Sequence, residues 1–336
     1  MKILCLCDAA VTLEQMAPMM ELEKYGGEIV VFQDDFIKSR EQFFEVMLKC
    51  EREGSDAVPH NEKILPLIKD ADIVTTHLSM INAKVLQAAE KLKLVAVMRG
   101  GTENVREDIC RERGIKIINA AWRSAHSVAD FTVGMILAEM KNIARGHRDL
   151  MDGKWTRGFA NSGHIRDLRR CTIGIVGCGN IGQRVIERLS GFGSAILVHD
   201  PFMSDAEVSG LGHVPASLET VLKKSDAVSL HLRLSEKTQN FISKKELGMM
   251  KKTAFIVNTS RAGIIDEAAL LEALQNRTIG GAALDVFVNE PLGENHPLLK
   301  LDNVTLTPHV AGTSSDTIAN SVEIIKDELE KILKAG

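Results

Sequence analysis

Short apolar segments alternate with helical patterns along the whole chain, and this alternation constrains the fold more than any other feature. Several of the segments are apolar throughout, which is typical of parallel strands that are covered on both faces. The first group comprises residues 2–7, 28–32, 72–77, 92–98 and 115–119, and the second comprises residues 172–177, 195–200, 226–232, 254–260, 281–287 and 303–309. The pattern predicts an α/β fold with two doubly wound parallel-sheet domains.

Helical patterns, with apolar residues three or four positions apart, lie between the strands, for example at residues 83–92 and 267–276. A longer helical pattern at residues 127–153 separates the two groups of strands. It suits either a connecting or dimer-facing helix or a helix of the core. The final segment, residues 314–336, is typical of a C-terminal helix, and we expect it to pack back onto the first domain. A length of 336 residues agrees with two domains at roughly 150 residues each.

The composition argues against several classes of protein. The net charge is −4, from 41 basic and 45 acidic residues, and aromatic residues make up only 4%, so we expect no nucleic-acid partner. The six cysteines form no paired CxxC units, so we expect no metal site and a reducing, cytoplasmic location. The first apolar run ends at Asp8, too short for a signal sequence. No run approaches the roughly 20 residues that cross a bilayer, so we expect no membrane partner.

A glycine-rich motif with the pattern GxGxxG follows the apolar segment 172–176 and leads into a helical pattern. The first glycine of such a motif allows a tight turn, the second lets the backbone approach a pyrophosphate, and the third lets the helix pack close to the strand. The pyrophosphate then meets the free amides of the helix N-terminus. The motif predicts dinucleotide binding by Gly177, Gly179, Asn180, Ile181 and Gly182. The alternative is a glycine-rich turn without a ligand.

An acidic residue, Asp200, stands at the end of the next apolar segment, near the offset of about 20 residues that is expected for a ribose-binding carboxylate. A carboxylate at this position accepts hydrogen bonds from both ribose hydroxyls and repels a 2′-phosphate. The sequence therefore favours NAD over NADP as the cofactor.

Three ionisable residues follow successive strands of the second group, where ligands bind in open α/β sheets. Arg261 can hold a carboxylate, His309 can exchange the proton of a hydroxyl group, and Glu290 can orient that histidine and stabilise its charged form. Each residue also has an alternative interpretation without a catalytic role. Arg261 could be a solvated loop charge, Glu290 a surface acid and His309 a structural imidazole. The three together predict the acid–base chemistry that accompanies hydride transfer to or from a hydroxy acid.

Four segments carry a resemblance to a known family. GCGNIG (177–182), VNTSRAGIIDEAAL (257–270), AALDVFVNEPL (282–292) and NVTLTPHVAG (303–312) have the order and spacing of the signatures of the D-isomer-specific 2-hydroxyacid dehydrogenases. The chain therefore resembles this family over nearly its whole length. The resemblance implies a Rossmann NAD-binding domain inserted into a flavodoxin-like substrate-binding domain. It places the substrate-binding domain at residues 1–119 and 314–336, and the NAD-binding domain at residues 120–313.

The resemblance also implies roles for individual residues. Catalysis is assigned to Arg261, Glu290 and His309, with His309 as the acid–base and Glu290 as its partner. The cofactor contacts include Asp200 at the ribose, Asp285 at the nicotinamide amide, and Thr259. Substrate contacts are assigned to Leu78, Gly100, Gly101 and Arg261. Members of the family are typically homodimers, with the long helix after the domain boundary in the interface.

The sequence leaves open which 2-hydroxy acid is the substrate. A D-3-phosphoglycerate dehydrogenase-like enzyme is one alternative, and a dinucleotide-sensing protein that resembles a corepressor is another. Formate is disfavoured because the formate-oxidising relatives have glutamine at the position of Glu290. Three arginines near the expected clefts, Arg99, Arg123 and Arg233, are either exposed loop residues or ligands for an extra anionic group.

Overall fold

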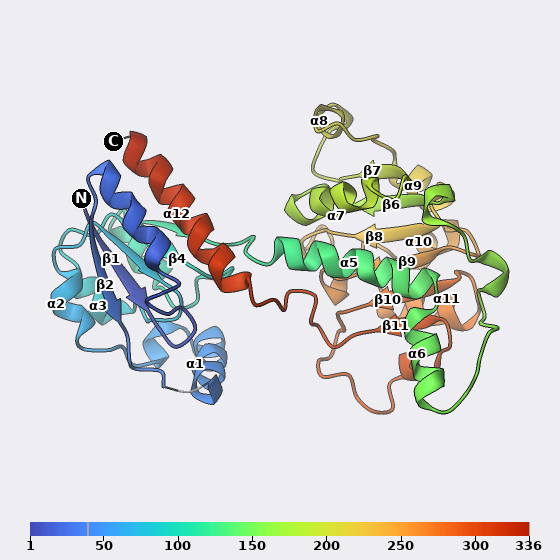
Figure 1. Ribbon diagram of the computed structural model, residues 1–336, viewed down its shortest axis with the longest axis horizontal. Coiled ribbons are helices and arrows are strands. Elements are labelled where there is room, and N and C mark those ends of the chain that lie inside the picture. The colour runs from blue at the N-terminus through green and yellow to red at the C-terminus, as the bar shows by residue number, and fades with distance from the viewer. Residues whose placement is uncertain (39, 336) are drawn as a thin grey trace. The chain divides into compact units, whose positions relative to one another are not determined.

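The computed structural model describes residues 1–38 and 40–335. The chain divides into two compact units: a first unit of residues 1–123 and 314–336, and a second unit of residues 124–313. Each unit contains one parallel β-sheet with helices on both faces (Figure 1). The expected fold class, two doubly wound parallel-sheet domains, is confirmed.

The first unit is built on a five-stranded parallel sheet with the strand order β2-β1-β3-β4-β5. Its strands are β1 (Lys2–Cys7), β2 (Glu28–Gln33), β3 (Ile73–Thr76), β4 (Leu94–Val97) and β5 (Lys116–Asn119). Its helices are η1 (Ala17–Tyr25), α1 (Arg40–Glu53), η2 (Ser55–Ala57), α2 (Ile64–Ile68), α3 (Ala83–Ala88), α4 (Glu107–Glu112) and α12 (Thr317–Ala335).

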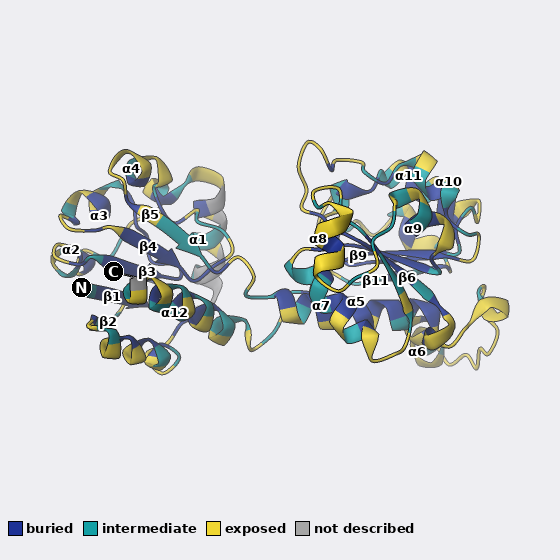
Figure 2. Ribbon diagram, turned by 90° about the horizontal axis from the view of Figure 1, so that it is seen from above, coloured by how far each residue is buried: buried dark blue, intermediate teal, exposed yellow. Residues whose placement is uncertain are grey.

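Strand β1 shows why these segments are apolar throughout. Successive side chains of a strand point to opposite faces, so both faces of a covered sheet need apolar residues. Leu4 and Leu6 belong to a core with α2, α3 and α4, whereas Ile3 and Cys5 belong to a second core with η1 and α12. Figure 2 shows the central strands β3 and β4 as buried and the edge strand β5 as intermediate.

The C-terminal helix α12 packs onto the first unit, next to η1. Val322, Ile325 and Leu329 lie in the same core as β1 and are essentially inaccessible to solvent. At the surface, the hydroxyl of Tyr25 donates a hydrogen bond to Glu330 over 2.6 Å. The last helix of the chain therefore completes the domain that the first residues begin.

The second unit is built on a six-stranded parallel sheet with the order β11-β10-β9-β8-β6-β7. Its strands are β6 (Thr172–Val176), β7 (Ala195–His199), β8 (Ala227–Leu230), β9 (Phe255–Asn258), β10 (Gly281–Leu284) and β11 (Val304–Leu306). Its helices are α5 (Ala125–Met140), α6 (Ile143–Met151), η3 (Ser162–His164), η4 (Leu168–Arg170), α7 (Asn180–Ser190), α8 (Asp205–Gly210), α9 (Leu218–Lys224), α10 (Lys244–Met249), η5 (Ala262–Ile264), α11 (Glu267–Gln275) and η6 (Pro297–Lys300).

The expectation of one helix over residues 127–153 is wrong, because the segment forms two helices that break at Asn142. Asn142 has a φ of 57°, in the left-handed region that ends a right-handed helix and that asparagine tolerates. Its side chain is buried and hydrogen-bonded on both sides, donating to Asn161 over 2.7 Å and accepting from Arg145 over 3.0 Å. The helix periodicity does not reveal this break, because α6 continues the apolar pattern.

A buried ion pair connects the two helices around this break. Arg145 Nη2 lies 2.7 and 2.8 Å from the two carboxylate oxygens of Glu139, and both residues are buried. Thr305 of β11 donates a hydrogen bond to the same carboxylate over 2.7 Å. Arg145 Nε also donates to the carbonyl of Asp302 over 2.6 Å. The pair therefore fixes α5, α6 and β11 to one another.

The remaining expectations concern the cysteines and the membrane. All six cysteines are buried and carry thiols rather than disulfides. Burial raises the pKa of the Cys5 thiol to about 11, which keeps it protonated. Within residues 1–38 and 40–335, no helix has the length and apolar character needed to cross a membrane.

Candidate active site

The glycine motif forms a turn between β6 and α7 in which two glycines are sterically required. Gly177 has a φ of 101°, and a Cβ there would lie 2.7 Å from the carbonyl carbon of His231. A Cβ on Gly182 would lie 2.1 Å from the carbonyl oxygen of Gly177, because helix and strand approach closely here. A Cβ on Gly179 would have no neighbour within 4 Å, so the space next to it is open. The turn therefore has the shape of a backbone cradle for a pyrophosphate.

Helix α7 begins directly after Gly179, which has no side chain to accept hydrogen bonds from the first amides of the helix. Such an uncapped N-terminus attracts an anion through its free amides and the helix dipole. The side chain of Asn180 accepts a hydrogen bond from Arg184 over 3.2 Å, and Ile181 packs against the core of the unit. These contacts leave the backbone of the motif as the group that faces a ligand, which fits a dinucleotide.

Asp200, at the end of β7, is held next to this turn. Its Oδ2 accepts a hydrogen bond from the amide of Cys178 over 2.6 Å, and its Oδ1 accepts from the amide of Phe202 over 2.8 Å. The carboxylate is half-buried and has a fixed orientation beside the glycine motif. This position suits a group that accepts hydrogen bonds from ribose hydroxyls and repels a 2′-phosphate.

Arg261, Glu290 and His309 line one cavity of about 560 Å³ at the carboxyl ends of β9, β10 and β11. His309 Nδ1 lies 2.7 Å from Glu290 Oε2, and Glu290 Oε1 accepts a hydrogen bond from the amide of Phe287 over 2.9 Å. Since Nδ1 faces a carboxylate, we assign it the proton, which leaves Nε2 for a substrate. The structure therefore brings the three residues together around one space.

The environment of Glu290 favours its charged form. Partial burial acts to raise the pKa of this carboxyl, but the hydrogen bond from His309, the amide of Phe287 and the charge of Arg261 together lower its pKa below the usual value. Glu290 is therefore ionised at neutral pH. An ionised carboxylate at this distance stabilises a protonated imidazole.

The segment that carries His309 is held by Asp285, a contact that the sequence motifs do not show. His309 has a φ of 53°, in the left-handed region. The fully buried carboxylate of Asp285 accepts hydrogen bonds from the hydroxyl of Thr307 over 2.6 Å and from the amides of Val310 and Ala311 over 3.0 and 2.9 Å. Asp285 thus fixes the backbone on both sides of His309, and its predicted contact with the nicotinamide amide stays a prediction.

The end of β9 positions Arg261 through its neighbours. The side chain of Asn258 donates a hydrogen bond to the carbonyl of Arg261 over 3.0 Å and accepts one from the amide of Ser260 over 3.0 Å. Arg261 Nη1 donates to the carbonyl of Ser260 over 2.7 Å. Thr259 is buried, and its hydroxyl lies 2.7 Å from the hydroxyl of Thr132 on α5. Asn258 is a positioning residue to which the sequence motifs assign no role.

The substrate contacts expected in the first unit lie at the carboxyl ends of its strands. Leu78 is fully buried, and its amide donates a hydrogen bond to Asp8 over 2.9 Å. Gly100 and Gly101 form an accessible turn after β4, and the carbonyl of Gly100 accepts a hydrogen bond from Asn119 over 2.7 Å. The amide of Leu78 is thus already used within the protein.

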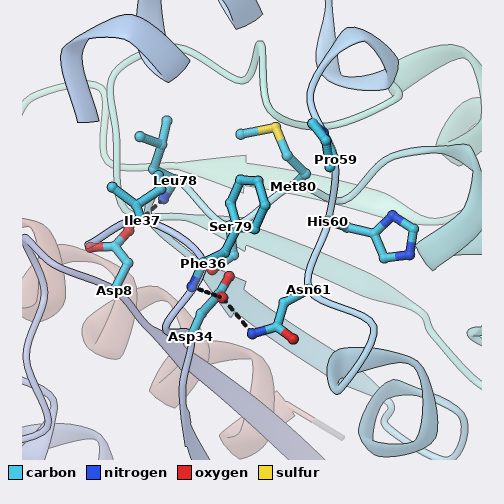
Figure 3. Close-up of a pocket in the computed structure, with 10 residues that line it drawn as sticks. All are labelled: Asp8, Asp34, Phe36, Ile37, Pro59, His60, Asn61, Leu78, Ser79 and Met80. Atoms are coloured by element: carbon cyan, nitrogen blue, oxygen red, sulfur yellow. Dashed lines mark hydrogen bonds between the residues drawn. The ribbon is translucent and has the colours of Figure 1, made fainter. Parts of the chain in front are cut away.

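Leu78 also borders a small enclosed cavity, whose lining residues are drawn in Figure 3. The cavity is about 10 Å³ and lies between the ends of β1, β2 and β3, with Asp8 and Asp34 on one side and His60 and Met80 on the other. A volume of this size holds about one water molecule. This cavity is therefore too small for an organic substrate.

Comparisons with known proteins show which family the chain is similar to. Residues 133–311 match the family described as "D-isomer specific 2-hydroxyacid dehydrogenase, NAD binding domain". The glyoxylate reductase of Korarchaeum cryptofilum is 37% identical over 276 residues, 82% of this chain and 83% of that protein. The D-3-phosphoglycerate dehydrogenase of Methanocaldococcus jannaschii is 36% identical over 81% of this chain, and the match spans 52% of that relative.

A solved structure shows the same fold. The D-lactate dehydrogenase from Aquifex aeolicus, complexed with NAD and lactic acid, is similar over 99% of this chain and 94% of that one, with a TM-score of 0.60 and 25% identity. The second unit is thus a Rossmann domain with NAD as its cofactor. The chain belongs to the D-isomer specific 2-hydroxyacid dehydrogenases, NAD-dependent oxidoreductases that act on the CH–OH group of their substrates.

Proposed function

We propose that the protein catalyses reversible hydride transfer between NAD(H) and C2 of a short 2-hydroxy or 2-keto acid. The observation that carries the proposal is the hydrogen bond between His309 and Glu290 inside the cavity that Arg261 also lines. This arrangement supplies a proton donor, a carboxylate that stabilises its charged form, and a cation for the substrate. NAD(H), when bound, supplies or accepts the hydride.

Each of the three side chains has its own role in proton transfer or substrate binding. In the direction of reduction, protonated His309 donates the proton on Nε2 to the ketone oxygen, and in oxidation the neutral imidazole accepts it from the hydroxyl. Glu290 stabilises the imidazolium and fixes the orientation of the ring. The guanidinium of Arg261 binds the substrate carboxylate or polarises the carbonyl.

We assign the first unit to substrate binding, with the amides of Gly100 and Gly101 holding the substrate carboxylate and Leu78 bordering the substrate. The turn at Gly100 and Gly101 is accessible, which agrees with this role. In the second unit, the backbone of Gly177–Gly182, together with Asp200, Thr259 and Asp285, binds NAD. The six buried cysteines, all present as thiols, support a reducing compartment such as the cytoplasm.

The test is NADH oxidation by the purified protein with a panel of 2-keto acids, including glyoxylate, hydroxypyruvate, pyruvate and 3-phosphohydroxypyruvate. We expect turnover with at least one of them. Turnover with 3-phosphohydroxypyruvate alone would favour the D-3-phosphoglycerate dehydrogenase-like alternative, which the relative from M. jannaschii supports. Tight NADH binding without turnover of any keto acid would contradict an enzyme and favour a dinucleotide sensor.

Replacing Glu290 by glutamine is expected to lower kcat for keto-acid reduction by about 10-fold or more, because an amide cannot balance the charge that the imidazole carries as proton donor. The low pKa of Glu290 keeps its carboxylate charged across the neutral range, and this charge stabilises the protonated imidazole of His309. The amide of glutamine carries no charge and so does not provide this stabilisation. The measurement is kcat for keto-acid reduction between pH 5 and 9, with the exposed Glu294→Gln as the matched control. An unchanged kcat would contradict the pairing.

We also propose that the protein is a homodimer that uses the exposed apolar residues at the end of α6. Leu150, Met151 and Trp155 are 57%, 75% and 82% exposed, and exposed apolar side chains grouped in this way are typical of an interaction surface. Light scattering is expected to give twice the mass of the chain, and Trp155→Asp is expected to shift the protein toward the single-chain mass. A single-chain mass for the unaltered protein would contradict this proposal.

A further inference from the structure

A chain of buried hydrogen bonds in the first unit leads from Asp8 to Arg123. Asp8 Oδ2 accepts from the amide of Leu78 over 2.9 Å and lies 3.1 Å from His77 Nδ1, and the other nitrogen of His77, Nε2, lies 3.2 Å from Arg123 Nη1. Asp8 and His77 are only 3% and 2% exposed. Because a guanidinium only donates hydrogen bonds, Nε2 of His77 is the acceptor and its proton lies on Nδ1, toward Asp8.

The surroundings of Asp8 favour the charged form of its carboxyl group. Burial acts to raise its pKa, but the hydrogen bond from His77 and those from the amides of Val11 and Ala10 lower its pKa below the ordinary value. The two amides donate to Oδ1 over 3.0 and 2.8 Å. The carboxylate therefore fixes the tautomer and the orientation of His77, which in turn fixes Arg123.

Only one end of the Arg123 guanidinium is used by these contacts. Nη1 is near His77 Nε2 and also donates to the carbonyl of Met98 over 3.3 Å. The backbone carbonyl of Arg123 accepts a hydrogen bond from Asn320 of α12 over 3.0 Å. Among the side chains that the structure describes, no carboxylate lies within 4.0 Å of this guanidinium, and none accepts a hydrogen bond from its Nε or Nη2. A held arginine with two free donor groups is suited to an anion.

A second guanidinium, that of Arg99, lies close to Arg123 in the same unit. Arg99 directly follows Met98, whose carbonyl Arg123 contacts, and directly precedes the turn at Gly100 and Gly101. Arg99 is 6% exposed, and its Nη2 lies 3.8 Å from Glu103. Burial and the charge of Arg99 lower the pKa of Arg123. The buried guanidinium of Arg99 repels the partly buried guanidinium of Arg123, and an anion bound beside Arg123 offsets this repulsion.

We propose that Arg123, positioned by His77 and Asp8, binds a second anionic group of the substrate, a carboxylate or a phosphate, in addition to the carboxylate of the 2-keto acid. The inference rests on the proposed function, because it is the turn at Gly100 and Gly101 that would hold the keto-acid carboxylate next to Arg123. The substrate is then a dianionic 2-keto or 2-hydroxy acid. Arg123 is a specificity-determining residue that the family motifs do not include.

The experiment compares kcat/KM for NADH-dependent reduction of two dianionic substrates, oxaloacetate and 3-phosphohydroxypyruvate, with that of glyoxylate and pyruvate. We expect the unaltered protein to prefer one dianionic substrate, and which one shows whether the second group is a carboxylate or a phosphate. Arg123→Gln is expected to lower kcat/KM for that substrate by about 10- to 100-fold, as for a lost charged hydrogen bond. The values for glyoxylate and pyruvate are expected to change far less. The exposed Arg111→Gln is the matched control.

His77 is tested as a positioning residue through the selectivity ratio, the kcat/KM of the dianionic substrate divided by that of glyoxylate. His77→Ala is expected to lower this ratio, whereas a merely structural defect lowers both values together. In the double variant with Arg123→Gln, the loss of His77 is expected to have little further effect on the ratio, because both act through one guanidinium. Additive effects would contradict this role for His77.

Two outcomes overturn the proposal and leave the proposed function intact: a protein that prefers glyoxylate or pyruvate, or an Arg123→Gln variant that loses activity equally with all substrates. If no keto acid is reduced, the proposed function fails. Titration calorimetry then tests separately whether Arg123 binds an anionic group. In the presence of NAD⁺, 3-phosphoglycerate or D-malate is then expected to bind more weakly to Arg123→Gln. No binding of either ligand, or binding that Arg123→Gln does not change, overturns the proposal that Arg123 binds an anionic group.

Discussion

Replacing His309 by glutamine is expected to lower kcat by about 10²- to 10⁴-fold and to leave the affinity for NADH nearly unchanged. Glutamine keeps much of the size and hydrogen-bonding capacity of the side chain but cannot exchange a proton with the substrate. The glycine turn and Asp200 lie at the ends of β6 and β7, away from the Glu290–His309 contact at the ends of β10 and β11. Loss of the imidazole should therefore affect chemistry rather than cofactor binding.

The measurement for His309 combines steady-state kinetics with a fluorescence titration of NADH. The exposed His164→Gln is the control, because this side chain lies on η3 outside the cavity. A His309→Gln variant with kcat close to that of the unaltered protein would contradict the acid–base role. Equal losses in turnover and NADH affinity would indicate instead that the substitution disturbs the segment held by Asp285.

Replacing Arg145 by leucine is expected to lower the free energy of unfolding by about 3–5 kcal/mol. The substitution leaves the buried carboxylate of Glu139 without its cation, with only Thr305 as a hydrogen-bond donor. Burial already raises the pKa of Glu139 even in the presence of Arg145. An uncompensated charge at this depth is far more costly than the loss of an exposed ion pair.

Urea unfolding followed by circular dichroism measures this loss. The exposed Arg148→Leu, on the same helix, is the matched control and is expected to change stability by less than about 0.5 kcal/mol. The double variant Glu139→Leu with Arg145→Leu should recover part of the loss, because it removes the unpaired charge. An Arg145→Leu variant as stable as the unaltered protein, or a double variant as unstable as the sum of the two single ones, would contradict the argument.

Several features of the fold could be predicted because they depend on local patterns. Every segment predicted as a strand contains a strand of the structure, since a segment that is apolar on both faces can be buried in few other ways. The position of the glycine motif follows for the same reason, because Gly177 and Gly182 serve a turn whose sterics do not depend on the rest of the chain. The prediction of a single helix over residues 127–153 is wrong because the break at Asn142 depends on tertiary contacts. The side chain of Asn142 is held by Asn161 and Arg145.

The candidate site also combines features that local patterns predict with contacts that they do not. The motif positions could identify Arg261, Glu290 and His309, because parallel strands bring their carboxyl ends to one edge of a sheet. The motifs do not show that Asp285 holds the backbone around His309, nor that His77 contacts Arg123. Asp285 and Ala311 are far apart in the sequence, as are His77 and Arg123. No spacing rule connects such residues.

The amino-acid sequence by itself determined the two parallel sheets, the dinucleotide turn and the candidate residues at the strand ends, because periodicity, glycine sterics and strand ends act within short stretches of chain. Only the tertiary structure decided where the long helix breaks, which carboxylate holds the His309 segment, and how Arg123 is oriented. These contacts join segments that folding brings together, and their geometry depends on the packing of whole elements. Arg123, an open question in the sequence, becomes a specific proposal through its contact with His77.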